Sequence, residues 1–190
     1  MAHGVSAVST LTALRERTTG TSGTFRLGDT TAVFDSTYGP LKATWAYNQA
    51  PLETYGECAA AFEDAAAGDW YVDEDEDESG VIGQEFVVGA FLNTAAETAA
   101  GYCWVLTAGR NPVALTTDGS VAAGYGVIAT STDGTWGGVA SSVNIATTGT
   151  AYAGWGWFAG IATTDDTSGN SLAAGDCIFA SIWSVFPVTC

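Results

Sequence analysis

Short apolar runs, separated by clusters of Gly, Asp, Asn and Thr, fill most of the sequence after residue 81. This spacing is typical of strands joined by tight turns. Two further strands, 31–35 and 41–47, are expected around a turn at 36–40. In the second, alternation places Leu41, Ala43, Trp45 and Tyr47 on one face, which is expected to face the core. The other predicted strands are 84–92, 101–108, 112–117, 125–130, 136–146, 151–162 and 175–185. Since no helices are expected between them, these strands predict an all-β fold, a β-sandwich or a β-barrel.

One phrase, Ala-Ala-Gly followed by Asp or Tyr and an apolar run, occurs four times. Its glycines are Gly68, Gly101, Gly124 and Gly175, and their unequal separations exclude a repeat of fixed period. We interpret the phrase as turn chemistry, because Gly permits the positive φ at which a chain reverses before it enters a sheet. Gly68 is the weakest case, because it can cap a helix instead.

Three segments depart from the strand pattern. Residues 1–24 are expected to form a flexible N-terminal arm, in which 9–17 could make a short helix, before a β-rich domain of residues 25–190. The stretch 57–67 is rich in Ala and is followed by Gly, which favours a short helix. Six consecutive acids, 73–78, predict an exposed loop, because adjacent like charges resist packing.

Charge is distributed unevenly along the chain. The net charge is −16, yet residues 1–42 hold four of the five basic residues. The remainder carries Arg110 as its one cation against 18 acids. Because such an acidic body repels phosphate groups, neither nucleic acid nor an anionic membrane is expected as a partner. Because the sequence has no apolar stretch of membrane-spanning length, and the residues at its start do not follow the pattern of a secretory signal, neither a membrane span nor a signal is expected.

Groups suited to catalysis are scarce. The only histidine, His3, lies in the predicted arm, so a nucleophile held beside a rigid base is not expected. A carboxylate pair such as Glu85 and Glu97 could serve a glycosidase, but nothing in the sequence brings the two together. We therefore expect no catalytic residues and no enzyme activity.

Metal and cofactor sites are not expected either. The cysteines are Cys58, Cys103, Cys177 and Cys190. They lack the spacing of zinc ligands, and buried free thiols are the expected state in a reducing cytosol. The acidic run 73–78 lacks the spaced ligands and the Gly of a calcium loop, so a solvated loop is favoured over a metal site.

Aromatic residues exceed what one core face requires: seven Trp, seven Tyr and eight Phe. Alternation along 151–162 cannot place Trp155 and Trp157 on one face and also bury Phe158 beside them. At least one such ring is therefore expected outside the core, at a subunit or partner interface or at a sugar-stacking site.

The order of these strands and turns resembles a known family. Residues 101–134 contain Tyr-Cys-Trp-Val, then Asn-Pro-Val, then Asp-Gly-Ser-Val-Ala-Ala-Gly. Trp-Phe-Ala-Gly-Ile-Ala follows at 157–162, and Leu-Ala-Ala-Gly-Asp-Cys-Ile-Phe at 172–179. The stretch 25–29, Phe-Arg-Leu-Gly-Asp, is similar to the opening strand of that family. Together these motifs resemble the head decoration, or capsid cement, proteins of tailed phages.

The resemblance implies a virion structural protein. Such a chain would be made in the host cytoplasm, bind the major capsid protein on the outer capsid surface and stabilise the head, commonly as a homo-oligomer; we expect a homotrimer. The candidates for contact with the capsid or with another subunit are Arg15, Arg17, Arg26, Trp155 and Trp157. The alternative is a carbohydrate-binding or adhesive β module, with or without calcium at the acidic loop.

Overall fold

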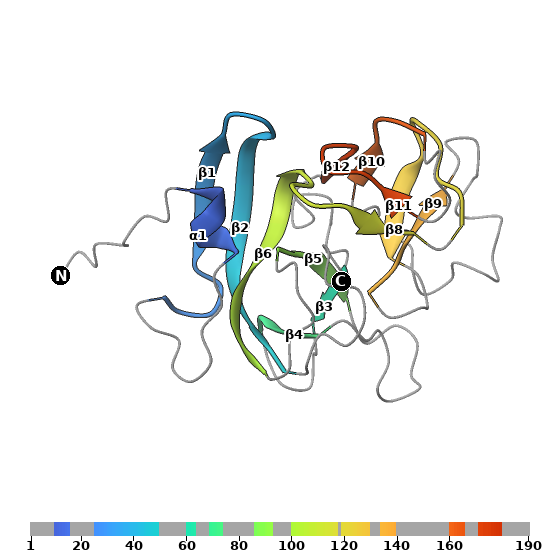
Figure 1. Cartoon of the computed structure of the whole chain (residues 1–190). Coiled ribbons are helices and arrows are strands. Elements are labelled where there is room, and N and C mark those ends of the chain that lie inside the picture. The colour runs from blue at the N-terminus through green and yellow to red at the C-terminus, as the bar shows by residue number, and fades with distance from the viewer. Residues whose placement is uncertain are drawn as a thin grey trace, which may run out of the picture.

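The computed structural model describes residues 10–15, 25–49, 60–63, 69–73, 86–92, 100–117, 119–129, 134–139, 160–165 and 171–179. In this part the protein is all-β with one short helix, α1 (Leu11–Leu14) (Figure 1). The strands are β1 (Thr30–Asp35), β2 (Gly39–Asn48), β3 (Ala60–Glu63), β4 (Tyr71–Asp73), β5 (Phe86–Phe91), β6 (Gly101–Arg110), β7 (Leu115–Thr116), β8 (Gly126–Ala129), β9 (Trp136–Val139), β10 (Gly160–Ala162), β11 (Ser171–Leu172) and β12 (Cys177–Phe179). No helix in the described part is both long and apolar enough to cross a membrane.

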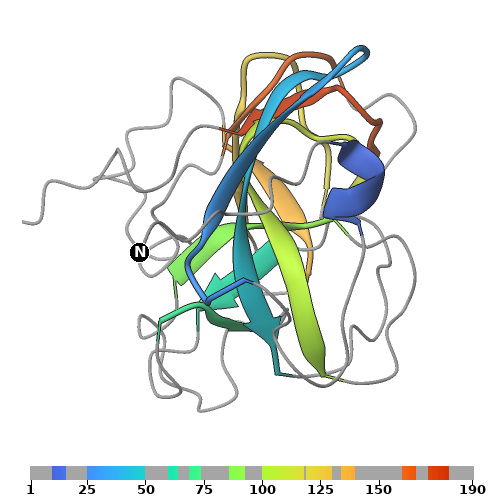
Figure 2. The same cartoon turned by 90° about the vertical axis from the view of Figure 1, so that its left-hand side faces the viewer.

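Ten of these strands form one sheet in the order β1-β2-β4-β3-β5-β6-β12-β10-β8-β9. β2 also pairs with β6, so the sheet folds back on itself at this long antiparallel pair. Figure 2 shows the two strands side by side. Only β2 and β4 pair in parallel within the sheet. Because β1 and β9 stay at its two edges, the described strands do not close into one barrel.

The described residues form two hydrophobic cores, and one face of the β2–β6 pair lies against the larger core. Leu41, Ala43 and Trp45 of β2 belong to it, as do Trp104 and Leu106 of β6. All five side chains are at most 3% exposed. The face predicted for the second strand from its alternation is therefore confirmed for these residues of β2.

The other face of the same pair is buried as well. Ala46, Cys103 and Val105 belong to a second, smaller core that also includes Val72 of β4 and Phe91 of β5. Strands buried on both faces read as nearly continuous apolar runs, as β6 does. The alternation of β2 predicts one buried face, whereas the structure shows two.

Two of the four Ala-Ala-Gly phrases form the predicted turns. Gly124 and Gly175 have φ values of +81° and +91°. The amide of Tyr125 donates to the Ala122 carbonyl at 3.0 Å, and that of Asp176 to the Ala173 carbonyl at 3.1 Å. Each Gly is thus the third residue of a four-residue turn, the position at which a type II turn needs positive φ.

The other two phrases do not repeat this geometry in the described residues. Gly101 is the first residue of β6 and is not among the glycines with positive φ. It therefore starts a strand, as expected, but without the turn conformation. Gly68 lies outside the described residues.

The helix predicted at 57–67 is wrong where the structure describes it, because Ala60–Glu63 is strand β3. β3 pairs with β5 on one side and β4 on the other. Helix propensity is a local preference of a few tenths of a kcal/mol per residue, so two strand ladders formed with distant residues can override it.

The predicted arm and acidic loop are also partly packed. α1 lies against β1, and its Leu14 is fully buried in the larger core. Residues 10–15 are therefore part of the folded domain and not a flexible arm. Asp73, the first residue of the acidic run, ends β4 and is 5% exposed, so it does not belong to an exposed loop. Residues 74–78 lie outside the described residues.

Candidate interaction surfaces

The β1–β2 hairpin carries the most exposed large apolar side chain of the described residues, Phe34, which is 77% exposed. The antiparallel register pairs Ala32 with Lys42 and Phe34 with Pro40. Directly paired residues point to the same face of a sheet, and all four of these residues are exposed. We call these four residues the hairpin face.

The turn at the tip of the hairpin fixes its register. Oδ1 of Asp35 accepts hydrogen bonds from the amides of Thr37 (2.8 Å) and Tyr38 (3.1 Å). Gly39 follows with a φ of +78°, which Gly adopts without strain. Val33 is buried in the larger core, so alternation directs the next side chain, Phe34, to the opposite face.

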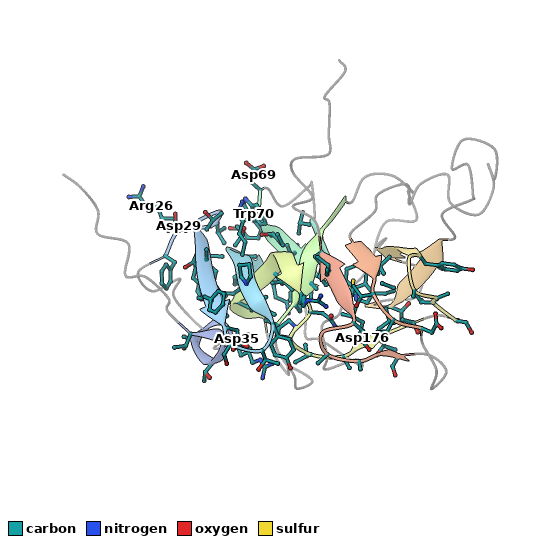
Figure 3. The ribbon with its side chains drawn as sticks, turned by 90° about the horizontal axis from the view of Figure 1, so that it is seen from above. Arg26, Asp29, Asp35, Asp69, Trp70 and Asp176 are labelled. Carbon is teal, nitrogen blue, oxygen red and sulfur yellow. The ribbon has the colours of Figure 1, made fainter. Side chains whose placement is uncertain are left out.

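The basic residues predicted as contacts have different environments. Nη2 of Arg15 donates to the Pro112 carbonyl at 3.1 Å and so ties α1 to its own domain. Arg26 is exposed, and its amide donates to Oδ2 of Asp29 at 2.8 Å. Figure 3 shows Arg26 and Asp29 on the side of the molecule where Trp70 also lies. The other candidates, Arg17, Trp155 and Trp157, lie outside the described residues.

A second surface is a row of three tyrosines from three neighbouring strands. The register pairs Tyr47 of β2 with Tyr71 of β4 on one side and with Tyr102 of β6 on the other. All three are half-buried. The ring centroids of Tyr47 are 5.6 Å from Tyr71 and 4.8 Å from Tyr102, at interplanar angles of 65° and 61°. We call Tyr71, Tyr47 and Tyr102 the tyrosine row.

The tyrosine row continues the aromatic packing of the core. The Tyr102 ring lies parallel to Trp45, with an interplanar angle of 9° and a centroid distance of 6.2 Å. Trp45 in turn contacts Trp104 at 4.9 Å, and Phe25 packs against both tryptophans. One end of the row is therefore held by buried rings.

A strained tryptophan positions the other end of the row. Trp70 precedes β4 and has a φ of +66°, a conformation that L residues rarely adopt. Its carbonyl accepts a hydrogen bond from the Tyr47 amide at 2.9 Å. Its ring lies so close to Gly28 that a Cβ there would be 3.0 Å from Cδ1 and Nε1. These contacts fix Tyr71 beside Tyr47.

A buried asparagine joins the end of β6 to the start of β12. Nδ2 of Asn111 donates to the carbonyls of Val113 (2.8 Å) and Ala173 (3.0 Å), and its Oδ1 accepts from the Cys177 amide (2.8 Å). Asn111 is fully buried. Nη1 of Arg110 adds a 2.6 Å hydrogen bond to the Gly175 carbonyl. This junction sets the position of the last described turn.

The two described cysteines, Cys103 and Cys177, are buried free thiols, as expected. Burial raises the pKa of Cys177 to about 12, so its thiolate is not formed at neutral pH. The other two cysteines, Cys58 and Cys190, lie outside the described residues. Within the described ranges, no three His, Cys, Asp or Glu side chains are grouped closely enough to hold a metal ion.

The sequence indicates some of these features and misses others. Tyr47 is predicted on the core face of its strand, but the tyrosine row is missed because β4 is not predicted. The Ala-Ala-Gly phrase at Gly68 is the one local signal of that strand. No signal marks Phe34 as exposed or Asn111 as buried.

Comparison with family models, with curated proteins and with solved structures finds no match to this chain.

Proposed function

We propose that the chain is a virion structural protein, a decoration subunit that binds the major capsid protein on the outer surface of the head and stabilises the shell. The observation that carries this proposal is the hairpin face, where Phe34 is 77% exposed beside the exposed Lys42. The order of the sequence motifs in residues 25–183, which resembles that of tailed-phage decoration proteins, supports the proposal independently.

The hairpin face has the chemistry of a protein contact. Exposed aromatic side chains are enriched at interfaces, where a few well-packed residues carry most of the binding energy. Lys42 and Arg26 are exposed cations in a chain of net charge −16. Because Lys42 belongs to the hairpin face, electrostatic attraction would favour an acidic patch of the shell as the partner of this face.

The edge of the hairpin favours association too. Among the described residues, β1 has β2 as its one strand partner. Residues 30–34 of this edge strand contain no charge and no Pro, the features by which edge strands usually avoid pairing with other chains. We include the homotrimer in the proposal, with Arg26, Arg17, Trp155 and Trp157 as further contact candidates. Arg15 is assigned to holding α1 on its own domain.

Co-sedimentation with capsids tests the proposal. Capsids assembled from the major capsid protein of the same genome, without this chain, are mixed with the wild type or with the variants Phe34→Ser and Lys42→Glu. We expect the wild type to sediment with the capsids in saturable amounts. Phe34→Ser should weaken binding by about 2 kcal/mol, or some 30-fold, as for an interface anchor.

Ile178 of β12 provides the matched control, because it is the other exposed large apolar residue of the described part, at 40%. Ile178→Ser should bind capsids like the wild type. The proposal is wrong if the wild type does not sediment with the capsids. The assignment of the hairpin face is wrong if Phe34→Ser binds as well as Ile178→Ser.

A further inference from the structure

We infer that the tyrosine row is a binding site for a neutral oligosaccharide chain, on which successive sugar rings stack. This inference does not rest on the decoration function, because the row and the hairpin face share no residue. A sugar ring has apolar C–H faces and polar edges. A ligand of this kind is matched by aromatic rings that also carry hydroxyl groups.

The geometry of the row suits a linear ligand. Tyr71, Tyr47 and Tyr102 come from β4, β2 and β6 at one level, so the row runs across the strands. The centroid separations of 5.6 and 4.8 Å are close to the length of one pyranose ring. Neighbouring rings are tilted by 65° and 61°, so they pack edge to face against one another and form a continuous aromatic row, of which the exposed part of each ring can contact a sugar.

The hydroxyl groups of the row distinguish it from a purely apolar packing of rings. Among the hydrogen bonds of the described residues, none engages the side chain of Tyr47, Tyr71 or Tyr102. A phenol that served only for packing could be replaced by Phe, whereas Tyr adds a hydrogen-bond donor and acceptor to each ring. Half-buried rings that carry hydroxyl groups match the mixed apolar and polar surface of a sugar.

Charge selects a neutral ligand over an anionic one. Tyr71 lies between Asp69, which is exposed, and the acidic run that begins at Asp73. A polyanion such as nucleic acid or an acidic glycan would be repelled by these carboxylates. A neutral glycan is not repelled, and its hydroxyls can donate hydrogen bonds to an exposed carboxylate such as that of Asp69.

The row is organised before any ligand arrives. Tyr102 is held against Trp45, and the contact between Trp70 and Gly28 holds β4 in place next to β2. Binding to rings that are already ordered costs little side-chain entropy, which favours a weak ligand such as a sugar. The strained φ of Trp70 is maintained by the surrounding packing and keeps Tyr71 in the row.

Native affinity electrophoresis of the full chain tests the inference. The gels contain a mixed-linkage β-glucan, a galactomannan or an arabinoxylan as neutral probes, and alginate as the anionic probe. We expect at least one neutral probe to retard the wild type and alginate not to. Tyr47→Ala, at the centre of the row, should weaken binding about tenfold, and Tyr47→Phe should weaken it less.

Two further variants separate stacking from folding. Tyr71→Ala, at the end of the row, should also reduce retardation, and it serves if Tyr47→Ala fails to melt cooperatively. Phe34→Ser removes an exposed aromatic side chain outside the row and should leave retardation unchanged.

The inference is overturned if no neutral probe retards the wild type, or if the Tyr47 and Tyr71 variants are retarded like the wild type. It is also overturned if light scattering shows that Tyr47→Ala dissociates an oligomer, because the row would then be a subunit contact.

Discussion

Replacing Asn111 should be the most destabilising single polar substitution that the described structure offers. Its side chain makes three hydrogen bonds, to the carbonyls of Val113 and Ala173 and from the amide of Cys177, at 2.8, 3.0 and 2.8 Å. Asn111→Ala leaves all three backbone groups without that partner. Leaving a buried group unpaired costs about 1–3 kcal/mol. The Ala173 carbonyl keeps its hydrogen bond from the Asp176 amide, so two buried groups, the Val113 carbonyl and the Cys177 amide, are left unpaired, and we expect a loss of about 2–6 kcal/mol.

Asn111→Asp distinguishes hydrogen bonding from simple filling of space. The carboxylate keeps an acceptor for the Cys177 amide, but it turns a negative oxygen towards the carbonyls of Val113 and Ala173. Burial raises the pKa of the introduced carboxyl in the folded state above its unfolded value. Stability gained by protonation is therefore fully present below the unfolded pKa and is lost as pH rises through the folded pKa. At pH 7 this variant should be no more stable than Asn111→Ala, and it should recover towards acid.

Urea unfolding, followed by tryptophan fluorescence and far-UV circular dichroism, measures these differences by linear extrapolation. Ser120→Ala is the control, because Ser120 is exposed, and surface substitutions usually change stability by less than about 0.5 kcal/mol. A loss below about 1 kcal/mol for Asn111→Ala would refute the reasoning, since it would mean that water replaces the three bonds at no cost.

Two further predictions concern backbone strain and a buried amide. Gly124 has a φ of +81° and open space around it, so Gly124→Val should cost about 1–2 kcal/mol through backbone strain alone, whereas Gly124→Asn should cost less. Thermal unfolding checks this, and a Val variant that melts with the wild type would show that the turn does not need Gly. Asn48 is fully buried, and neither polar atom of its side chain has a hydrogen-bond partner. Asn48→Val should therefore stabilise the fold by about 1–3 kcal/mol, and a lower melting temperature would mean that a bound water satisfies the amide.

The sequence predicts the local parts of the fold well. The hairpin of β1 and β2 and the strand β6 follow from short-range patterns that residues a few positions apart can carry. β3 does not, because alanines suit a helix equally well and only the ladders to β4 and β5 decide between the two states. The second buried face of β2 likewise depends on strands that follow it in the chain.

Candidate surfaces are harder to predict than strands, because they are built from distant residues. The tyrosine row needs residues 47, 71 and 102 at one level, which depends on the register of β2 with both β4 and β6. A shift of one residue in either register would turn one tyrosine to the opposite face. No local pattern in the sequence records these registers. The exposure of Phe34 depends in the same way on the packing of Val33 against α1 and the larger core.

The Ala-Ala-Gly phrase shows how a short local signal can act within the tertiary structure. β8 follows the phrase that ends at Gly124, and β12 follows the one that ends at Gly175. These two strands are the neighbours of β10 on its two sides. The amide of Gly124 donates to the Ala162 carbonyl at 2.8 Å, and the amide of Thr163 donates to the Asp176 carbonyl at 2.6 Å. The same type of turn therefore precedes both strands that flank β10. The two turns hydrogen-bond to two consecutive residues at the end of β10, Ala162 and Thr163. The two phrases are alike because each must form a turn with a positive φ before a strand that pairs with β10. This need does not depend on how far apart the two phrases lie along the chain.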